Sequence, residues 1–541
     1  MIDFPGPRRS SWAPETGYAD YAVLNGTVYF RAMSGSPDAD RLWRTDGTKE
    51  GTWAVGEVMS IDGIQALPDR LVFKGRTFAG GYQLWSSDGT ETGTVQVTNE
   101  TYLRPSVDQI VGSDGRLAFF TPNFPPDLSA PITPIPTWRS DGTAEGTKRV
   151  ESAGNPEFGG VTSVARFQDH TFFLGLKSGG DLYFWRSDGT PEGTVPLVHT
   201  PTYHLDVAGN LTATSRYLFF TAESYYGAET SLWRSDGTAE GTLAVGGEGV
   251  GQLTRAGGLV YFTGGPPWAG AELWRSDGSK EGTVMLGEIW PGNRGALPQG
   301  LAPLGDLLLF SAEDGTHGRE LWRIGNTESA STLVRDINPG AHSSVVSSLA
   351  ATGNRVVFFA DDGVSGAELW RSDGTTEGTQ LVKDIWPGVG DSGPYYLLSY
   401  TPFVTVGGLA YFTANDSVHG AELWRTDGTA EGTFVVKDLT PTPGQSSTPW
   451  NLMVAGHTLF FTAWTPEYGS ELWKTDGTEE GTILVGDINP GSGSSSRPER
   501  LLYAGGKVFF VADDGTTGAE LWCYELDSVR GPVRYRPQQR R

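Results

Sequence analysis

The chain has 541 residues, of which 38% are hydrophobic and 11% aromatic, so it can bury a substantial core and is not expected to be disordered. Its formal net charge of −24 disfavours nucleic acids and anionic membrane surfaces as partners, because binding to phosphates needs a basic surface. The single cysteine, Cys523, excludes an intramolecular disulfide and a cysteine-based zinc site. No apolar run approaches the 18 residues of a membrane-spanning helix.

The first residues, Met1 to Phe4, have neither the basic start nor the apolar stretch of a signal peptide. We therefore expect either a cytoplasmic protein or a mature form whose leader has been removed. The N-terminal segment also resembles a segment much later in the chain: Ile2-Asp3-Phe4-Pro5-Gly6 is similar to Asp384-Ile385-Trp386-Pro387-Gly388.

A tryptophan-containing motif recurs eleven times at a mean spacing of about 48 residues. A fixed period of this length is typical of solenoids, repeat arrays and propellers. The recurring tryptophans are Trp43, Trp85, Trp138, Trp185, Trp233, Trp274, Trp322, Trp370, Trp424, Trp473 and Trp522.

The eighth repeat shows the predicted strands most clearly. Residues 349–352, 355–360, 368–371 and 380–385 are short apolar, β-branched or aromatic runs separated by glycine-rich turns. Helical periodicity is found nowhere in the chain. Four short strands in each repeat indicate the blade of a β-propeller.

The eleventh repeat stops after its third strand, and we expect residues 1–6 to supply the missing outer strand. This closure removes exposed sheet edges. The sequence therefore predicts one all-β domain over residues 1–541, a β-propeller of eleven four-stranded blades in one closed ring, followed by a tail at 524–541. Two fused propellers are the alternative.

The repeated motif itself is interpreted as structural. Its tryptophans are expected to fill the space between neighbouring sheets, and a glycine such as Gly374 to adopt the positive φ that the turn needs, while Asp373 and Thr375 bind loop amides. The arginine after each tryptophan, for example Arg371, is expected to pair with a glutamate of a neighbouring turn, such as Glu377 or Glu431. Ligand binding by each turn is the alternative. The structural tryptophans that we single out are Trp274, Trp322, Trp370, Trp424, Trp473 and Trp522.

The motif Glu368-Leu369-Trp370-Arg371-Ser372-Asp373-Gly374-Thr375 and its copies resemble the bacterial ELWxxDGT-repeat proteins, over residues 2–522. The match departs from the family pattern at 137–138, 184–185 and 324–327 and in the shortened last repeat. The resemblance implies an extracellular or cell-surface location and supplies no catalytic residues.

Variable loops are expected on one face of the propeller, opposite the Asp-Gly-Thr turns, and function commonly lies on such loops. These loops are rich in aromatic residues, which offer flat apolar surfaces for sugar rings. Trp290 and Trp386, beside Pro-Gly, are better interpreted as plugs of the blade ends. The candidate ligand-binding residues are Trp268, Trp464, Tyr468, Tyr225, Tyr226, Tyr395 and Tyr396.

Carboxylates also lie on this face, and oxygen ligands of this kind can bind calcium. None has the spacing of a calcium-binding loop, so solvated turns are the alternative interpretation, and no other cofactor is expected. His317 and His419 occupy equivalent places but fall in non-adjacent repeats. The candidate metal ligands are Asp361, Asp362, Asp513 and Asp514.

No motif of a serine hydrolase, zinc protease or phosphate-binding loop is present. The predicted function is a non-enzymatic extracellular binding or adhesion module, whose ligand is a carbohydrate or a surface protein. The alternatives are a polysaccharide-active enzyme with a carboxylate site and a scaffold for protein assembly.

Overall fold

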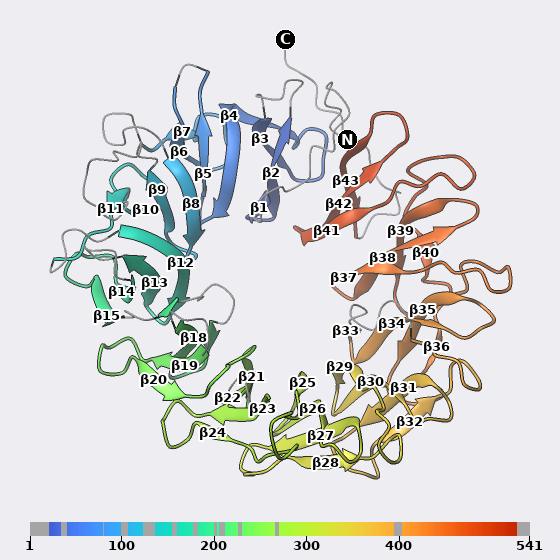
Figure 1. Cartoon of the computed structure of the whole chain (residues 1–541). Coiled ribbons are helices and arrows are strands. Elements are labelled where there is room, and N and C mark those ends of the chain that lie inside the picture. Colours follow the sequence, from blue (N-terminus) through green and yellow to red (C-terminus); the bar gives the residue numbers. More distant parts are fainter. Residues whose placement is uncertain are drawn as a thin grey trace.

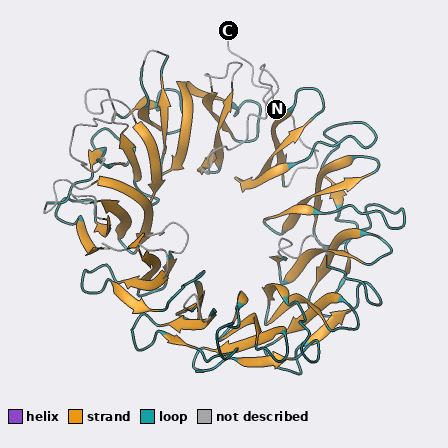
Figure 2. Cartoon of the chain, viewed as in Figure 1, coloured by secondary structure: helices purple, strands orange, loops and turns teal. Residues whose placement is uncertain are grey.

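The computed structural model contains strands and loops, with no helix in the part of the chain that it describes (Figure 2). Forty-three strands are described, in ten antiparallel sheets. No described helix is long and apolar enough to cross a membrane. The described residues are 21–33, 40–78, 80–98, 107–122, 136–153, 159–176, 182–199, 203–204, 211–224, 230–265, 270–393 and 403–526.

The first half of the chain forms a seven-stranded, two four-stranded and a five-stranded sheet. Their strands are β1 (Tyr21–Leu24), β2 (Thr27–Met33), β3 (Asp40–Thr45), β4 (Trp53–Ala66), β5 (Leu71–Arg76), β6 (Gln83–Ser87) and β7 (Val95–Gln96); β8 (Val107–Ser113), β9 (Ala118–Pro122), β10 (Trp138–Ser140) and β11 (Lys148–Arg149); β12 (Gly159–Phe167), β13 (His170–Leu176), β14 (Leu182–Ser187) and β15 (Val195–His199); β16 (Tyr203–His204), β17 (Thr212–Ala213), β18 (Leu218–Ser224), β19 (Thr230–Ser235) and β20 (Leu243–Gly246).

The second half forms five four-stranded sheets and a final sheet of three described strands. Their strands are β21 (Thr254–Ala256), β22 (Leu259–Gly264), β23 (Glu272–Ser276) and β24 (Val284–Met285); β25 (Gln299–Leu304), β26 (Leu307–Glu313), β27 (Arg319–Gly325) and β28 (Thr332–Arg335); β29 (Ser347–Thr352), β30 (Arg355–Asp361), β31 (Ala367–Ser372) and β32 (Gln380–Lys383); β33 (Val404–Val406), β34 (Leu409–Asn415), β35 (Ala421–Thr426) and β36 (Phe434–Val435); β37 (Trp450–Ala455), β38 (Thr458–Thr465), β39 (Gly469–Thr475) and β40 (Ile483–Leu484); β41 (Glu499–Ala504), β42 (Lys507–Asp513) and β43 (Ala519–Glu525).

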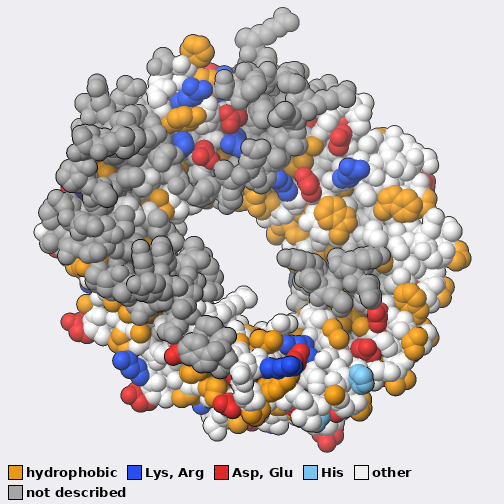
Figure 3. Space-filling model, viewed as in Figure 1, with side chains coloured by type: hydrophobic (Ala, Val, Ile, Leu, Met, Phe, Trp, Pro, Cys, Tyr) orange, Lys and Arg blue, Asp and Glu red, His pale blue; other side chains and the backbone are white. Residues whose placement is uncertain are grey.

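The sheets stand around a central opening, with the first strand of each sheet on the inside and the last on the outside (Figure 1). Figure 3 shows the same opening, and acidic and basic side chains scattered over the described part of this face. The all-β, propeller-like repeat fold predicted from the sequence is therefore confirmed.

Apolar side chains on facing sheets form the core. One cluster joins Leu321 and Val334 on one sheet to Phe358 and Trp370 on the next. Trp370 is 3% exposed, and its backbone lies opposite Phe358 and, after a β-bulge, Leu381. Of the tryptophans singled out as structural, Trp322, Trp424, Trp473 and Trp522 are also buried, and Trp274 is half-buried.

The Asp-Gly-Thr turn satisfies its own polar groups, as expected. In the eighth repeat, the Asp373 carboxylate accepts hydrogen bonds from the backbone N–H of Thr375 at 2.9 Å and from its hydroxyl at 2.7 Å. The Thr375 hydroxyl then accepts a hydrogen bond from the N–H of Gly378 at 2.9 Å. Gly374 has a φ of +86°, as predicted, which disfavours any side chain there.

The predicted pairing of Arg371 with a glutamate of a neighbouring turn, such as Glu377, is wrong in its partner group. Arg371 instead donates to the carbonyl oxygen of Gly428, in the turn of the next repeat, at 2.7 Å. A buried carbonyl needs a hydrogen-bond partner, whereas water can solvate the exposed Glu377. The same bond to the next turn is made by Arg44 to Gly89, Arg139 to Gly189, Arg186 to Gly237 and Arg425 to Gly477.

A buried glutamate holds the connection between sheets in five successive repeats. Glu368, with no exposed surface, accepts hydrogen bonds from the backbone N–H groups of Ile385 at 2.7 Å and Trp386 at 3.1 Å. These donors lie in the segment that leads to the next sheet. Equivalent bonds are made by Glu272 to Ile289 and Ala296, Glu320 to Ile337 and Ser344, Glu422 to Leu439 and Ser447, and Glu471 to Ile488 and Ser496.

The first and last sheets pack against each other through side chains. One apolar cluster combines Phe30 and Trp43 with Phe509 and Leu521, and Lys507 donates to the carbonyl oxygen of Asp46 at 2.6 Å. The predicted pairing of residues 1–6 with the last sheet lies outside the described residues.

Replacing Arg371 by alanine tests the bond between neighbouring repeats. The substitution removes the 2.7 Å bond to the buried Gly428 carbonyl, which keeps only the longer bond from Arg355 at 3.3 Å, so we expect the free energy of unfolding to fall by about 0.5–1.5 kcal/mol. Urea unfolding followed by fluorescence measures the change. Lys49→Ala, on an exposed turn, is the control, and an equal effect of the two substitutions would contradict the assignment.

The buried glutamates predict a pH dependence of stability. Burial raises the pKa of Glu368 from 4.5 to about 7, although the hydrogen bonds that it accepts lower it, and Glu320 and Glu471 are shifted in the same way. The folded protein therefore binds this proton more tightly than the unfolded chain does. The resulting stability is present below pH 4.5 and is lost as the pH rises through about 7.

Glu368→Gln removes one titrating group and should make the melting temperature less dependent on pH. One such proton changes the free energy of unfolding by about 1.4 kcal/mol per pH unit between the two pKa values. Calorimetry of wild type, Glu368→Gln and the exposed control Glu377→Gln across this range measures the difference. Equal slopes for all three proteins would rule out the proposed protonation.

Candidate functional site

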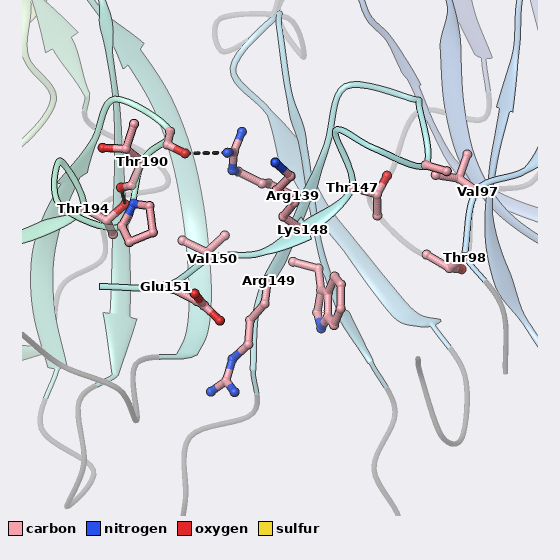
Figure 4. A pocket seen from close by; sticks show the side chains of 14 residues that line it. Val97, Thr98, Arg139, Thr147, Lys148, Arg149, Val150, Glu151, Thr190 and Thr194 are labelled. Atoms are coloured by element: carbon pink, nitrogen blue, oxygen red, sulfur yellow. Dashed lines mark hydrogen bonds between the residues drawn. The ribbon is translucent and has the colours of Figure 1, made fainter. Parts of the chain in front are cut away.

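A pocket of about 550 Å³ lies at the outer edge of the sheet β8–β11 (Figure 4). Its walls come from three successive repeats. Trp138, Arg139, Ala144 and residues 147–151 come from β10, β11 and the segments beside them. Val97 and Thr98 come from the preceding repeat, and Gly189, Thr190, Pro191 and Thr194 come from the turn of the next repeat. The pocket therefore exists only because neighbouring repeats are packed together.

Three cationic side chains line this pocket, against one carboxylate, Glu151. Backbone pairing places Arg139 opposite Lys148, and Trp138 opposite Arg149. Because cross-strand partners share a face, Arg139 and Lys148 lie on one face of the hairpin, and Trp138 and Arg149 on the other. Figure 4 shows Lys148 and Arg149 pointing in opposite directions from β11. The cations thus surround the edge of the sheet.

Arg139 is held in place by the next repeat. Its guanidinium donates to the Gly189 carbonyl, the bond drawn in Figure 4, and burial lowers the pKa of Arg139. An arginine side chain nevertheless remains charged at neutral pH. Lys148, beside it, is exposed. This pair combines one cation of fixed position with one that can move toward a ligand.

The other walls are apolar or already hydrogen-bonded. The ring of Trp138 stacks on Phe120, with 6.4 Å between the centroids. The Thr147 and Thr194 hydroxyls are hydrogen-bonded to serines of their own turns, at 2.6 and 2.7 Å. The cationic groups are therefore the main polar groups that the pocket offers a ligand.

The predicted aromatic site is described only in part. Trp464 and Tyr468 lie on one hairpin, formed by β38 and β39, and both are half-buried. Tyr468 packs against a core cluster that includes Leu439 and Trp473. Neither residue lines the pocket. The other candidates, Trp268, Tyr225, Tyr226, Tyr395 and Tyr396, lie outside the described residues.

The candidate metal ligands are bound to their own turns. The Asp362 carboxylate accepts backbone hydrogen bonds from Val364 and Ser365, and Asp361 and Asp513 bind the N–H groups two residues later. Burial opposes ionisation of Asp514, but hydrogen bonds from Thr517 and Thr516 lower its pKa to about 2. Among the described residues, no group of three or more His, Cys, Asp or Glu is arranged to hold a metal ion. Calcium binding stays a prediction.

The two equivalent histidines are also bound within their loops. His317 and His419 each place Nδ1 near the carboxylate three residues earlier, at 2.6 Å from Asp314 and 2.5 Å from Asp416. These pairs lie in separate sheets, so the structure does not bring them into one site.

The cationic pocket was not predicted from the sequence. The sequence does contain one indication of this pocket: Lys148 and Arg149 are consecutive cationic residues in a chain whose net charge is −24. The contribution of the following turn, Gly189 to Thr194, was not visible in the sequence, because it depends on how the repeats pack.

No protein-family model matches the chain, and no curated protein matches it; the resemblance to the ELWxxDGT-repeat proteins stays a prediction. Solved structures with some likeness include a puromycin hydrolase mutant complexed with PGG (15% identity, TM-score 0.28, covering 76% of this chain and 58% of that one). A second is the tricorn protease (11% identity, TM-score 0.31, covering 94% of this chain and 53% of that one). A third is a puromycin-hydrolyzing peptidase of Mycobacterium tuberculosis (13% identity, TM-score 0.29, covering 65% of this chain and 57% of that one). The chain thus spans little more than half the length of these proteins.

These matches contradict the predicted function. They are hydrolases and peptidases, whereas we expected a non-enzymatic module that binds carbohydrate or a surface protein, with a polysaccharide-active enzyme or an assembly scaffold as alternatives. The prediction failed because a repeat motif determines a scaffold, and one scaffold carries many unrelated functions. At these identities and TM-scores, the likeness assigns no activity to the chain.

Proposed function

We propose that the protein binds a small organic anion in the pocket between β10, β11 and the following turn. The observation that carries this proposal is the gathering of Arg139, Lys148 and Arg149 around one cavity of a strongly acidic protein. An anion approaching such a protein is repelled at long range, so local cations are needed to bind it. The expected ligand has a carboxylate or phosphate group.

The shape of the pocket supports a ligand with a flat apolar part. A cavity of about 550 Å³ is in the usual range for small-molecule sites. Trp138 and Val97 supply apolar walls, Arg149 supplies positive charge on the face of the hairpin that carries Trp138, and Arg139 and Lys148 supply it on the other face. An aromatic acid or an aromatic phosphate combines both features.

Charge reversal at Lys148 and Arg149 tests this site. Lys148→Glu/Arg149→Glu should weaken binding of an aromatic carboxylate or aryl phosphate by more than about tenfold, because two attractive charges become repulsive. Isothermal titration with matched carboxylate, phosphate and uncharged members of one aromatic series measures this and shows which anion is preferred.

Lys280→Glu, on an exposed turn of another repeat, is the control for net charge. Binding that is equally reduced by Lys280→Glu would indicate a general charge effect. Equal affinity for the uncharged members of the series would reject anion recognition.

We also propose that the sheets are eleven blades of one closed ring, with residues 1–6 completing the last blade. Three observations support this. Each of the eleven recurring tryptophans lies in a separate described strand, the fourteen-residue β4 belongs to two hairpins of the seven-stranded sheet, and the first and last sheets share a core cluster.

Electron microscopy of the isolated protein tests the ring. Class averages are expected to show one annulus with eleven spokes around a single opening. Two smaller annuli would support the alternative of fused propellers and would contradict the proposal.

A further inference from the structure

The hairpin of β1 and β2 turns through two residues, Asn25 and Gly26. Leu24 is paired with Thr27 on either side of them, and their φ angles are +51° and +77°. Asn-Gly is favoured in such a two-residue turn, because both positions need a left-handed backbone. Asn25 is exposed. The turn therefore presents an asparagine amide to water directly before a glycine.

This Asn-Gly pair is the only one in the sequence. The backbone nitrogen of the residue after an asparagine can attack the side-chain amide carbon, and a side chain on that residue obstructs the attack. Glycine carries no such obstruction. Asn354 lies in the equivalent hairpin of the eighth repeat, but it precedes Arg355. Asn25 is thus the asparagine most open to this reaction.

The same turn lies where the first sheet meets the last. A Cβ atom on Gly505, in the turn between β41 and β42, would lie 2.5 Å from the carbonyl oxygen of Gly26. A Cβ atom on Gly26 would lie 3.2 Å from the Cα atom of Gly505. The two turns are therefore in direct backbone contact, with no space for an additional atom between them.

The joint between these two sheets lacks a bond that several other joints have. Cys523 stands where the eighth repeat has Arg371, so no arginine at this position reaches the next turn. Lys507 supplies one bond in its place, to the Asp46 carbonyl oxygen at 2.6 Å. The two sheets also lie at opposite ends of the described chain, so no peptide segment leads directly from one to the other. The contact between the two turns therefore matters more at this joint than at the others.

We propose that Asn25 is a modification site, at which spontaneous conversion of the Asn25-Gly26 bond to an isoaspartyl bond weakens the joint between the first and last sheets. β1 has four residues and, among the described strands, pairs only with β2. Local opening of this short hairpin gives the backbone the freedom that the reaction needs. Water is the only co-reactant.

The reaction has two steps. The Gly26 nitrogen forms a bond to Cγ of Asn25, the bond from Cγ to Nδ2 breaks, and ammonia leaves with the proton of the Gly26 nitrogen, which closes a succinimide ring. Water then adds to one of the two ring carbonyls. Attack at the main-chain carbonyl carbon breaks its bond to the Gly26 nitrogen and gives isoaspartate, whereas attack at Cγ gives aspartate.

The two products differ in their effect on the turn. Both add a carboxylate, but only in isoaspartate does the main chain run through the side-chain methylene and become longer. The lengthened turn cannot keep both the pairing of Leu24 with Thr27 and the tight contact with Gly505. Isoaspartate therefore loosens the joint, and aspartate does not.

Incubation of the whole protein at mildly alkaline pH, followed by peptide mapping with mass spectrometry, tests the modification. Isoaspartate should form at Asn25 at least about tenfold faster than at Asn354, because only Asn25 precedes a glycine. Asn25→Gly is the unreactive control, since it removes the amide and keeps a Gly-Gly sequence that suits a turn with positive φ. Absence of isoaspartate at residue 25 of the wild type would overturn the proposal.

Hydrogen exchange of the same proteins tests the effect on the joint. The incubated wild type should exchange at least about tenfold faster than the fresh protein in β1 and in the hairpin of β41 and β42, while β30 and β31 stay unchanged. Incubated Asn25→Gly and fresh Asn25→Asp should show no acceleration, because neither has a lengthened main chain. Equal acceleration in either variant, or unchanged exchange in wild type that contains isoaspartate, would contradict the proposed mechanism.

Discussion

The structure depends on the need of every sheet to cover two apolar faces. A single four-stranded sheet has buried residues such as Phe358 on one side and Phe359 on the other, which belong to different core clusters shared with different neighbours. No sheet can therefore satisfy its own hydrophobic surface. Side-by-side packing around an axis meets this requirement for every sheet at once, and explains why one motif recurs along the whole described chain.

Polar side chains then determine how neighbouring sheets are placed. The arginine after the tryptophan reaches forward to the next turn, as from Arg371 to Gly428, and the buried glutamate binds the connecting segment, as from Glu368 to Ile385. Both bonds satisfy backbone groups that are removed from water at the joint. The apolar core supplies most of the stability, while these bonds restrict the sheets to one relative position.

The cationic pocket lies where the repeat departs from this pattern. In the third repeat, Pro136 stands where the eighth repeat has Glu368, and the hydroxyl of Thr137, the next residue, accepts a hydrogen bond from the N–H of Val161, twenty-four residues later. The connection to the next sheet is therefore held by a hydroxyl from a neighbouring position and not by a carboxylate. Arg139 keeps its reach to Gly189. The packing between repeats is therefore kept here, while the outer strand β11 carries Lys148 and Arg149 in place of the residues found at these positions in other repeats.

The sequence by itself determined the repeat, the strands and the chemistry of the turn. The eleven tryptophans gave the period, alternation and glycine-rich turns predicted all four strands of the eighth repeat to within a few residues, and Gly374 was correctly expected at positive φ. These features follow from local backbone preferences. Only the tertiary structure decided the partner of Arg371, the burial of Glu368 and the walls of the pocket. Each depends on residues about 17 to 57 positions away, brought into contact by the packing of successive sheets.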